Sequence, residues 1–204
     1  MPVVKVYFER LFSMLNGKIS REELIDIIPY LSLDIEEITD DYIRIEYNPN
    51  RPDFSTDYGL ARALNSFLQF ESKFDSYNVK ESNVSVTVDK STSKVRPYIV
   101  AALVKDINLD DESIRQIINM QEDLHNGIGR KRRKASIGIH NFDVIKPPIY
   151  YKTVGENFSF ITLNNLKSST IREILDNTDV GKSYGHIISG NSIYPILVDS
   201  VDGV

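Results

Sequence analysis

The feature that most constrains this chain is a run of five consecutive basic residues, 130–134, that passes directly into an alternating segment, residues 135–143. Because successive side chains of a strand point to opposite faces, Ser136, Gly138 and His140 would share one face. The apolar residues between them would share the other. The segment therefore predicts a strand with one face against the core and one face free to form a site.

The charge of the whole chain limits what the basic run can do. A formal net charge of -5 and a sequence pI near 5.3 argue against a protein that coats nucleic acid with most of its surface. A local cluster of Lys and Arg can still bind phosphate by releasing counterions. Two interpretations stay open for the run: a phosphate-binding site, or a solvated surface turn.

Length and composition favour a globular protein of two domains. The chain has 204 residues, of which 41% are hydrophobic and 26% charged. No apolar run approaches the roughly 20 residues that span a bilayer, and the N-terminus has no secretion-signal pattern. We therefore expect a cytoplasmic protein. Cysteine is absent, which excludes disulfides and thiolate nucleophiles, and three histidines make a transition-metal site unexpected.

The first 75 residues predict a small α+β module. Apolar spacing indicates helices, Ser20 and Glu23 form a capping-box pattern, and alternation around Asp40-Asp41 indicates a hairpin. The expected elements are a helix at 7–15, a helix from Ser20, strands at 35–39 and 42–47, and a helix from about Thr56 that Asp53 or Ser55 would cap. Arg51 and Asp53 could bind a ligand, but a pair that braces the loop is the simpler interpretation. A polar stretch, residues 72–83, contains the expected linker at 76–83.

Residues 84–204 predict a larger, mixed α/β domain. It would contain a long helix that starts after Asp110 and carries Glu122 and His125 three residues apart, where the two side chains can meet. The expected strands are 83–89, 98–107, 149–152, 158–161, 185–188 and 193–199, with a short helix capped by Ser168 or Ser169. The last six residues look like a turn that enters a further strand.

The histidines do not complete a known catalytic or metal motif. His125, His140 and His186 match no compact metal-ligand spacing. A triad of Ser136, His140 and Asp143 fails on distance, since four residues of strand span about 13 Å. Polar groups along one strand face could instead position a water to attack an activated ester, where positioning supplies much of the rate. A purely structural role for His140 also stays open.

Several motifs in order resemble the N-terminal half of the beta subunit of phenylalanyl-tRNA synthetase, of the archaeal and eukaryotic type. The resemblance itself runs from the first residues of the chain to the last. The motifs are Asn-Pro-Asn-Arg-Pro-Asp-Phe at 48–54, Tyr-Gly-Leu-Ala-Arg at 58–62, Lys-Val-Arg-Pro-Tyr-Ile-Val-Ala-Ala at 94–102, Gln-Glu-Asp-Leu-His at 121–125, Arg-Lys-Arg at 130–132 and Ala-Ser-Ile-Gly-Ile-His-Asn-Phe-Asp at 135–143.

The resemblance implies a B3/B4-like editing domain that hydrolyses tyrosine mistakenly attached to phenylalanine tRNA. The catalytic residues would be Ser136, His140 and Asp143, and no metal would be bound. The residues implied to contact substrate are Gly138, Glu122, His125, Tyr184 and His186. The residues implied to contact tRNA are Arg130, Lys131, Arg132 and Arg133.

The resemblance also implies partners and limits. The partners would be phenylalanine tRNA, the tyrosine it carries and an alpha subunit in a heterotetramer. Asn141 stands where the family often has Asp, which removes a carboxylate from that position. ATP and Mg²⁺ would bind only elsewhere in the full enzyme, and the family chain continues past Val204, where further pocket residues would lie. A non-catalytic module for tRNA binding or subunit assembly is the alternative function.

Overall fold

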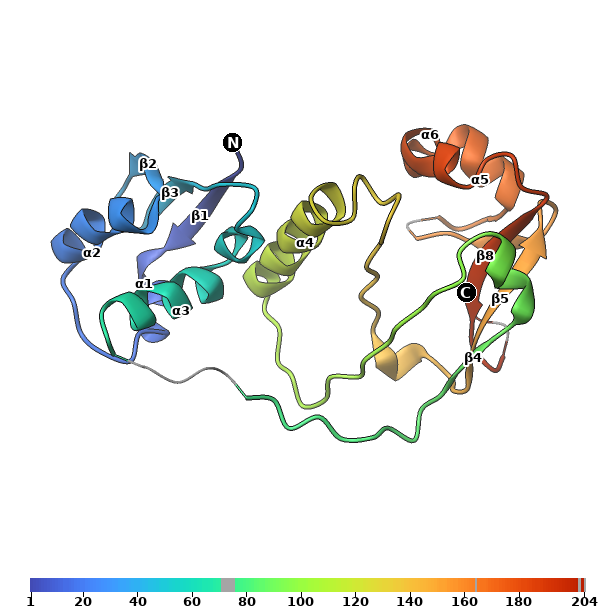
Figure 1. Ribbon diagram of the computed structural model, residues 1–204, viewed down its shortest axis with the longest axis horizontal. Coiled ribbons are helices and arrows are strands. Elements are labelled where there is room, and N and C mark those ends of the chain that lie inside the picture. Colours follow the sequence, from blue (N-terminus) through green and yellow to red (C-terminus); the bar gives the residue numbers. More distant parts are fainter. Residues whose placement is uncertain (71–75, 164, 202, 204) are drawn as a thin grey trace. The chain divides into compact units, whose positions relative to one another are not determined.

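The computed structural model describes residues 1–70, 76–163, 165–201 and 203. They divide into two compact units, Met1–Tyr77 with Asn108–Ile137 and Asn78–Ile107 with Gly138–Val204. The first unit combines helices with one small sheet and the second combines helices with two, so the predicted α+β class is confirmed (Figure 1). Within the described residues, no helix has the length and hydrophobicity to cross a membrane.

The first unit is built on a three-stranded antiparallel sheet. Its strands are β1 (Val3–Tyr7), β2 (Asp34–Ile38) and β3 (Tyr42–Glu46), in the order β1-β3-β2. The predicted hairpin is thus confirmed as β2 and β3, with a bulge between Ile35 and Glu37. The strand β1 was not predicted, because its five residues precede a helix without a turn signal. It pairs along its whole length with β3.

Local capping signals start the helices of this unit. Helix α1 (Phe8–Ser13) and helix α2 (Arg21–Ile27) are confirmed, and the predicted capping box joins Ser20 and Glu23 in both directions. Helix α3 (Asp57–Phe67) follows the short helices η1 (Ile28–Leu31) and η2 (Pro52–Ser55). The predicted cap of α3 was wrong. Thr56 caps it by accepting a hydrogen bond from the Gly59 amide, since Asp53 and Ser55 already belong to η2.

The core of the first unit lies between its sheet and helices α1, α2 and α3. Its members are all apolar and at most 6% exposed: Val4, Val6, Phe8, Leu11, Leu24, Ile28, Leu33, Ile43, Ile45, Tyr47, Phe54, Leu60, Ala61 and Leu64. This one cluster contains residues from every predicted apolar stripe of the first 68 residues. The predicted core faces are therefore confirmed except at Phe67, near the end of α3, which is 47% exposed.

The substitution Leu64→Ala should destabilise the first unit by about 2–5 kcal/mol, because it leaves a cavity at a fully buried position. Urea unfolding followed by far-ultraviolet circular dichroism measures this loss. The control Ile128→Ala removes an apolar side chain that is 73% exposed and should change stability by less than about 0.5 kcal/mol. Equal effects of the two substitutions would contradict this packing.

Helix α4 (Asp111–Asn126) docks on the first unit through polar contacts. The buried side chain of Gln116 accepts a hydrogen bond from the Asp57 amide at 2.8 Å, and the Tyr47 hydroxyl donates to Asp123. Burial raises the pKa of Tyr47, and the Asp123 carboxylate raises it further. Residues 108–137 therefore group with the first unit, whereas the sequence places them in a domain over 84–204. Periodicity identifies the helix but not the surface it packs on.

The second unit contains two small sheets. In the larger, β4 (Val86–Val88) pairs parallel with β5 (Ile149–Gly155), which pairs antiparallel with β8 (Ile193–Val198). The smaller joins β6 (Ser159–Ile161) to β7 (Ser168–Thr170). The remaining elements are η3 (Lys90–Lys94), η4 (Phe142–Val144), α5 (Ile171–Asn177), α6 (Asp179–Tyr184) and η5 (Gly185–Ile187).

Some predicted elements of this unit were wrong. Residues 98–107 form no strand, and Tyr98 and Val100 are more than 90% exposed, so their β propensity finds no neighbouring strand. The strand predicted at 185–188 is absent, because residues 185–187 form the short helix η5 directly after α6. The cap of α5 is Thr170, the last residue of β7, which forms a capping box with Glu173, and not Ser168 or Ser169. Residues 72–75 of the predicted linker region and residues 202 and 204 of the predicted C-terminal turn lie outside the described residues.

The carboxylate of Asp199 holds backbone segments of the second unit together near its C-terminal end. It accepts hydrogen bonds from the backbone amides of Lys146, Val201 and Gly203, at 2.7–3.0 Å. These donors, the Lys146 amide first, hold the pKa of Asp199 below its ordinary value of 3.8. The stabilisation is therefore complete above pH 3.8 and is lost as the pH falls through the lower pKa of the folded state.

The substitution Asp199→Asn should consequently lower the melting temperature of the second unit at neutral pH, because one amide nitrogen would face backbone donors. The difference from the unchanged protein should shrink as the pH is lowered below 3.8. Thermal unfolding at a series of pH values measures both effects. A difference that grows in acid would contradict the role of this carboxylate.

Candidate functional site

The basic run forms an ordered turn, which we call the cationic turn (residues 129–134). Its backbone amides at Gly129, Arg132 and Lys134 donate to the carbonyls of Leu124, His125 and Gly129 respectively, at 2.9–3.2 Å. A side chain at Gly129 would come within 2.8 Å of the carbonyl oxygens of His125 and Ala135, so this position needs glycine. The turn is therefore fixed to the last turn of α4.

Three consecutive residues of the cationic turn have left-handed backbone conformation. The φ angles are 50° at Arg130, 54° at Lys131 and 64° at Arg132. This conformation costs an L-residue roughly 1–2 kcal/mol, and runs of it are rare. Strain of this kind persists only where surrounding contacts enforce it, and it concentrates at functional sites.

The side chains of the cationic turn point in two directions. The exposed cations are Arg130, Lys131, Arg133 and Lys134. Arg132 is half-buried and donates to the carboxylate of Glu122 on α4. Because amides of the turn are used within it, a bound anion would be held mainly by the four exposed side chains.

His125 lies behind the cationic turn and is 2% exposed. Its Nε2 accepts a hydrogen bond from the Ile137 amide at 2.8 Å, so that nitrogen carries no proton. The proton therefore sits on Nδ1, which lies 3.2 Å from Oε1 of Glu122 and donates to it. Glu122 and His125, expected to contact substrate, are thus brought together with Arg132 in one network inside the first unit.

The segment after the cationic turn is extended but forms no strand. The prediction of a core-facing side was wrong, since Ile137 is 41% and Ile139 60% exposed. Alternation alone cannot supply the partner strand that would cover those side chains. Ser136 belongs to the first unit, whereas Gly138 and His140 belong to the second.

The exposed residues Gly138 and His140 are close neighbours. A Cβ at Gly138 would lie 2.8 Å from Nε2 of His140, so glycine leaves room for the imidazole. Asn141 then accepts a hydrogen bond from the Asp143 amide at 3.0 Å and caps η4. The predicted site residues Gly138, His140 and Asp143 therefore share one short exposed segment, and Asn141 has a local structural role.

His186 lies apart from that segment in sequence and lines a hollow of about 500 Å³ within the second unit. Charged side chains of both signs line the same hollow, among them Arg172, Asp176 and Lys182. Tyr184 ends α6 and is half-buried, but it is not among the residues that line this hollow. The hollow brings together elements that sequence spacing alone does not connect.

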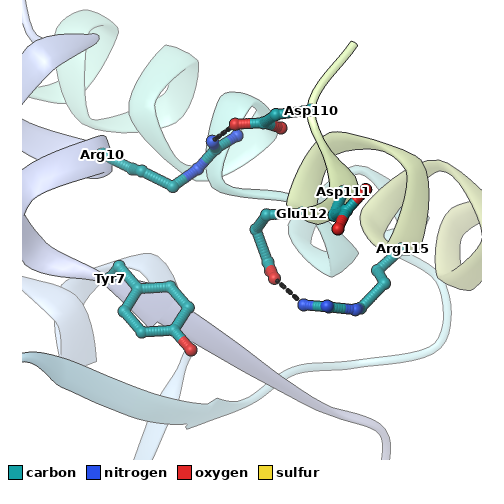
Figure 2. A pocket seen from close by; sticks show the side chains of 6 residues that line it. All are labelled: Tyr7, Arg10, Asp110, Asp111, Glu112 and Arg115. Atoms are coloured by element: carbon teal, nitrogen blue, oxygen red, sulfur yellow. Dashed lines mark hydrogen bonds and ion pairs between the residues drawn. The ribbon is translucent and has the colours of Figure 1, made fainter.

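An open hollow of about 600 Å³ in the first unit was not predicted (Figure 2). Six residues from two distant segments line it: Tyr7, Arg10, Asp110, Asp111, Glu112 and Arg115. Asp110 accepts from Arg10 and Glu112 accepts from Arg115. Hydrogen bonds from Ser113, followed by Arg10, lower the pKa of Asp110 to about 2. These charges stabilise the start of α4.

No group of three metal-binding side chains occurs among the described residues.

The chain resembles known proteins over its whole length. It is 41% identical to the phenylalanine–tRNA ligase beta subunit of Archaeoglobus fulgidus over 204 residues, which are 100% of this chain and 37% of that protein. It is 38% identical to the same subunit of Methanosphaera stadtmanae, over 98% of this chain and 36% of that protein. No family model matches.

A solved structure agrees with these sequence matches. The crystal structure of an N-terminal fragment of the phenylalanyl-tRNA synthetase beta subunit from Pyrococcus horikoshii superposes with a TM-score of 0.89 at 36% identity. The match covers 100% of this chain and 60% of that one. The chain spans less than two fifths of the length of the two curated relatives. In sequence and in fold, the chain belongs with the N-terminal region of phenylalanine–tRNA ligase beta subunits.

Proposed function

We propose that this chain binds phenylalanine tRNA and hydrolyses tyrosine that has been attached to it by mistake. The observation that carries the proposal is that the whole of this chain is similar to part of phenylalanine–tRNA ligase beta subunits. The cationic turn supports it, since four exposed cations lie shortly before the polar segment with His140 in the sequence. In the full enzyme, an alpha subunit would be the partner.

The chemistry explains why a second site is useful. A hydrophobic pocket for phenylalanine discriminates poorly against an analogue that only adds a hydroxyl. In comparable cases the ratio of the two kcat/KM values is only roughly 100. A separate hydrolytic site can bind that hydroxyl and remove the wrong product. The hydrolytic site would then recognise tyrosine by hydrogen bonds to its hydroxyl, which phenylalanine lacks.

The reaction needs a positioned water and an activated ester. Water attacks the ester carbonyl carbon, the bond from that carbon to the ribose oxygen breaks, and a proton passes to the ribose oxygen. His140 would orient or deprotonate the water, with Asp143 as a further polar contact and Gly138 leaving space for the substrate. ATP and Mg²⁺ would serve only the charging reaction elsewhere in the full enzyme. The hydrolysis of mischarged tRNA would take place in the cytoplasm.

The rates of hydrolysis of tyrosyl-tRNA and phenylalanyl-tRNA by this chain test the proposal. We expect the tyrosyl ester to be hydrolysed faster than the phenylalanyl ester, and both faster than without protein. If both esters were lost equally slowly while tRNA still bound, the proposed hydrolysis would be overturned. The chain would then be a non-catalytic module that binds tRNA. Absence of tRNA binding would overturn both functions.

A further inference from the structure

We infer that Arg132, Glu122 and His125 are positioning residues that hold the cationic turn in its left-handed shape, so that the other four cations bind phosphate together. This inference rests on the proposed tRNA-binding function and divides the basic run into two roles. Arg130, Lys131, Arg133 and Lys134 contact the polyanion, and Arg132 does not.

The first support is the difference in burial and partners within the run. The side chain of Arg132 is 26% exposed and forms an ion pair with Glu122, ten residues earlier on α4. Its four neighbours are exposed. A phosphate that recruited Arg132 would have to displace the Glu122 carboxylate, so the exposed cations offer the easier contact.

The second support is the position of His125 between two segments. Its backbone carbonyl accepts from the Arg132 amide at 3.2 Å, and its ring accepts from the Ile137 amide at 2.8 Å. One buried residue therefore fixes both the middle of the turn and the chain that leaves it. Because Glu122 accepts from both His125 and Arg132, the three side chains form one connected network.

The third support is the backbone of the turn. Three successive left-handed residues would relax without external contacts, and like charges on five neighbouring residues favour relaxation further. The network supplies the opposing contacts from the rigid end of a sixteen-residue helix. Its function is to present cations in a fixed arrangement, which lowers the entropy lost when RNA binds.

The test measures binding of a phenylalanine tRNA transcript as a function of salt concentration. Removing one phosphate contact, as in Lys134→Gln, should reduce the slope of log affinity against log salt by roughly 0.7–0.9. Arg132→Gln removes the same charge but also the brace, so we expect at least twice that reduction. Equal reductions would make Arg132 an ordinary phosphate contact and overturn the inference.

A second readout follows the turn without RNA. Limited trypsin digestion should cleave the turn of Arg132→Gln and of His125→Leu faster than that of Lys134→Gln or the unchanged protein. His125→Gln keeps an acceptor for the Ile137 amide and should restore part of the protection. Circular dichroism confirms that the rest of the unit is folded.

The two readouts separate this inference from the proposed function. If the unchanged protein bound no tRNA, the proposed function would fail, while digestion would still decide whether the network braces the turn. Equal digestion of Arg132→Gln, Lys134→Gln and the unchanged protein would overturn the brace, whatever the RNA result.

Discussion

The substitution His140→Ala should lower the rate of tyrosyl-tRNA hydrolysis by at least about 100-fold, the usual contribution of a general acid or base. The imidazole is exposed and lies against Gly138, where it can reach a substrate without disturbing a packed core. The affinity for tRNA should stay within about twofold, since phosphate contacts supply most of the binding free energy. Single-turnover hydrolysis and a binding assay measure the two quantities.

The matched control for this experiment is His186→Ala, which removes the other exposed histidine of the second unit. Because His186 is expected only to contact substrate, this variant should lower the hydrolysis rate less than His140→Ala does. If His186→Ala abolished hydrolysis and His140→Ala did not, the reaction would belong to the hollow that His186 lines. Unchanged hydrolysis in both variants would contradict the role of histidine altogether.

Neutralising the exposed cations of the turn should have the second large effect. Replacing Arg130, Lys131, Arg133 and Lys134 with glutamine should reduce the slope of log tRNA affinity against log salt by about 3. The affinity itself should fall roughly 10- to 100-fold at moderate salt. Fluorescence anisotropy of labelled tRNA at several salt concentrations measures both changes.

A control with the same loss of charge isolates the effect of position. Lys18, Lys80, Lys105 and Lys167 are all exposed and lie outside the cationic turn. Replacing these four with glutamine changes the net charge equally. The slope should change by less than about 1 in this control. Similar slopes for the two quadruple variants would show that net charge, and not the turn, attracts tRNA.

Local signals in the sequence predicted much of the first unit. Helix α2 begins at the capping box of Ser20 and Glu23, and β2 and β3 follow from alternation around a polar turn. These features depend on residues within one or two turns of each other. The apolar stripes also predicted the core, because a helix face and a strand face converge on the same interior.

Features that depend on distant partners could not be predicted. The docking of α4 depends on Gln116 meeting the Asp57 amide, 59 residues away in sequence. The absent strand at 98–107 shows that β propensity needs a neighbouring strand. The left-handed residues 130–132 carry no local signal, since Arg and Lys rarely adopt that conformation.

Only part of the geometry around the cationic turn could be predicted from the sequence. Glu122 and His125 were expected to meet because they lie three residues apart on a helix, and they do. That Arg132 joins them, ten residues from Glu122, follows only from the fold of the turn. The roles of Ser136, His140 and Asp143 stay predictions that substitution can test.

The most direct measurement is a crystal structure of this protein with a non-hydrolysable tyrosyl-adenosine analogue. We expect the ester mimic to lie beside His140 and Gly138, within hydrogen-bond distance of the imidazole or of a water that it holds. An analogue bound instead in the hollow lined by Arg172 and His186, with residues 136–143 untouched, would contradict the proposed role of His140.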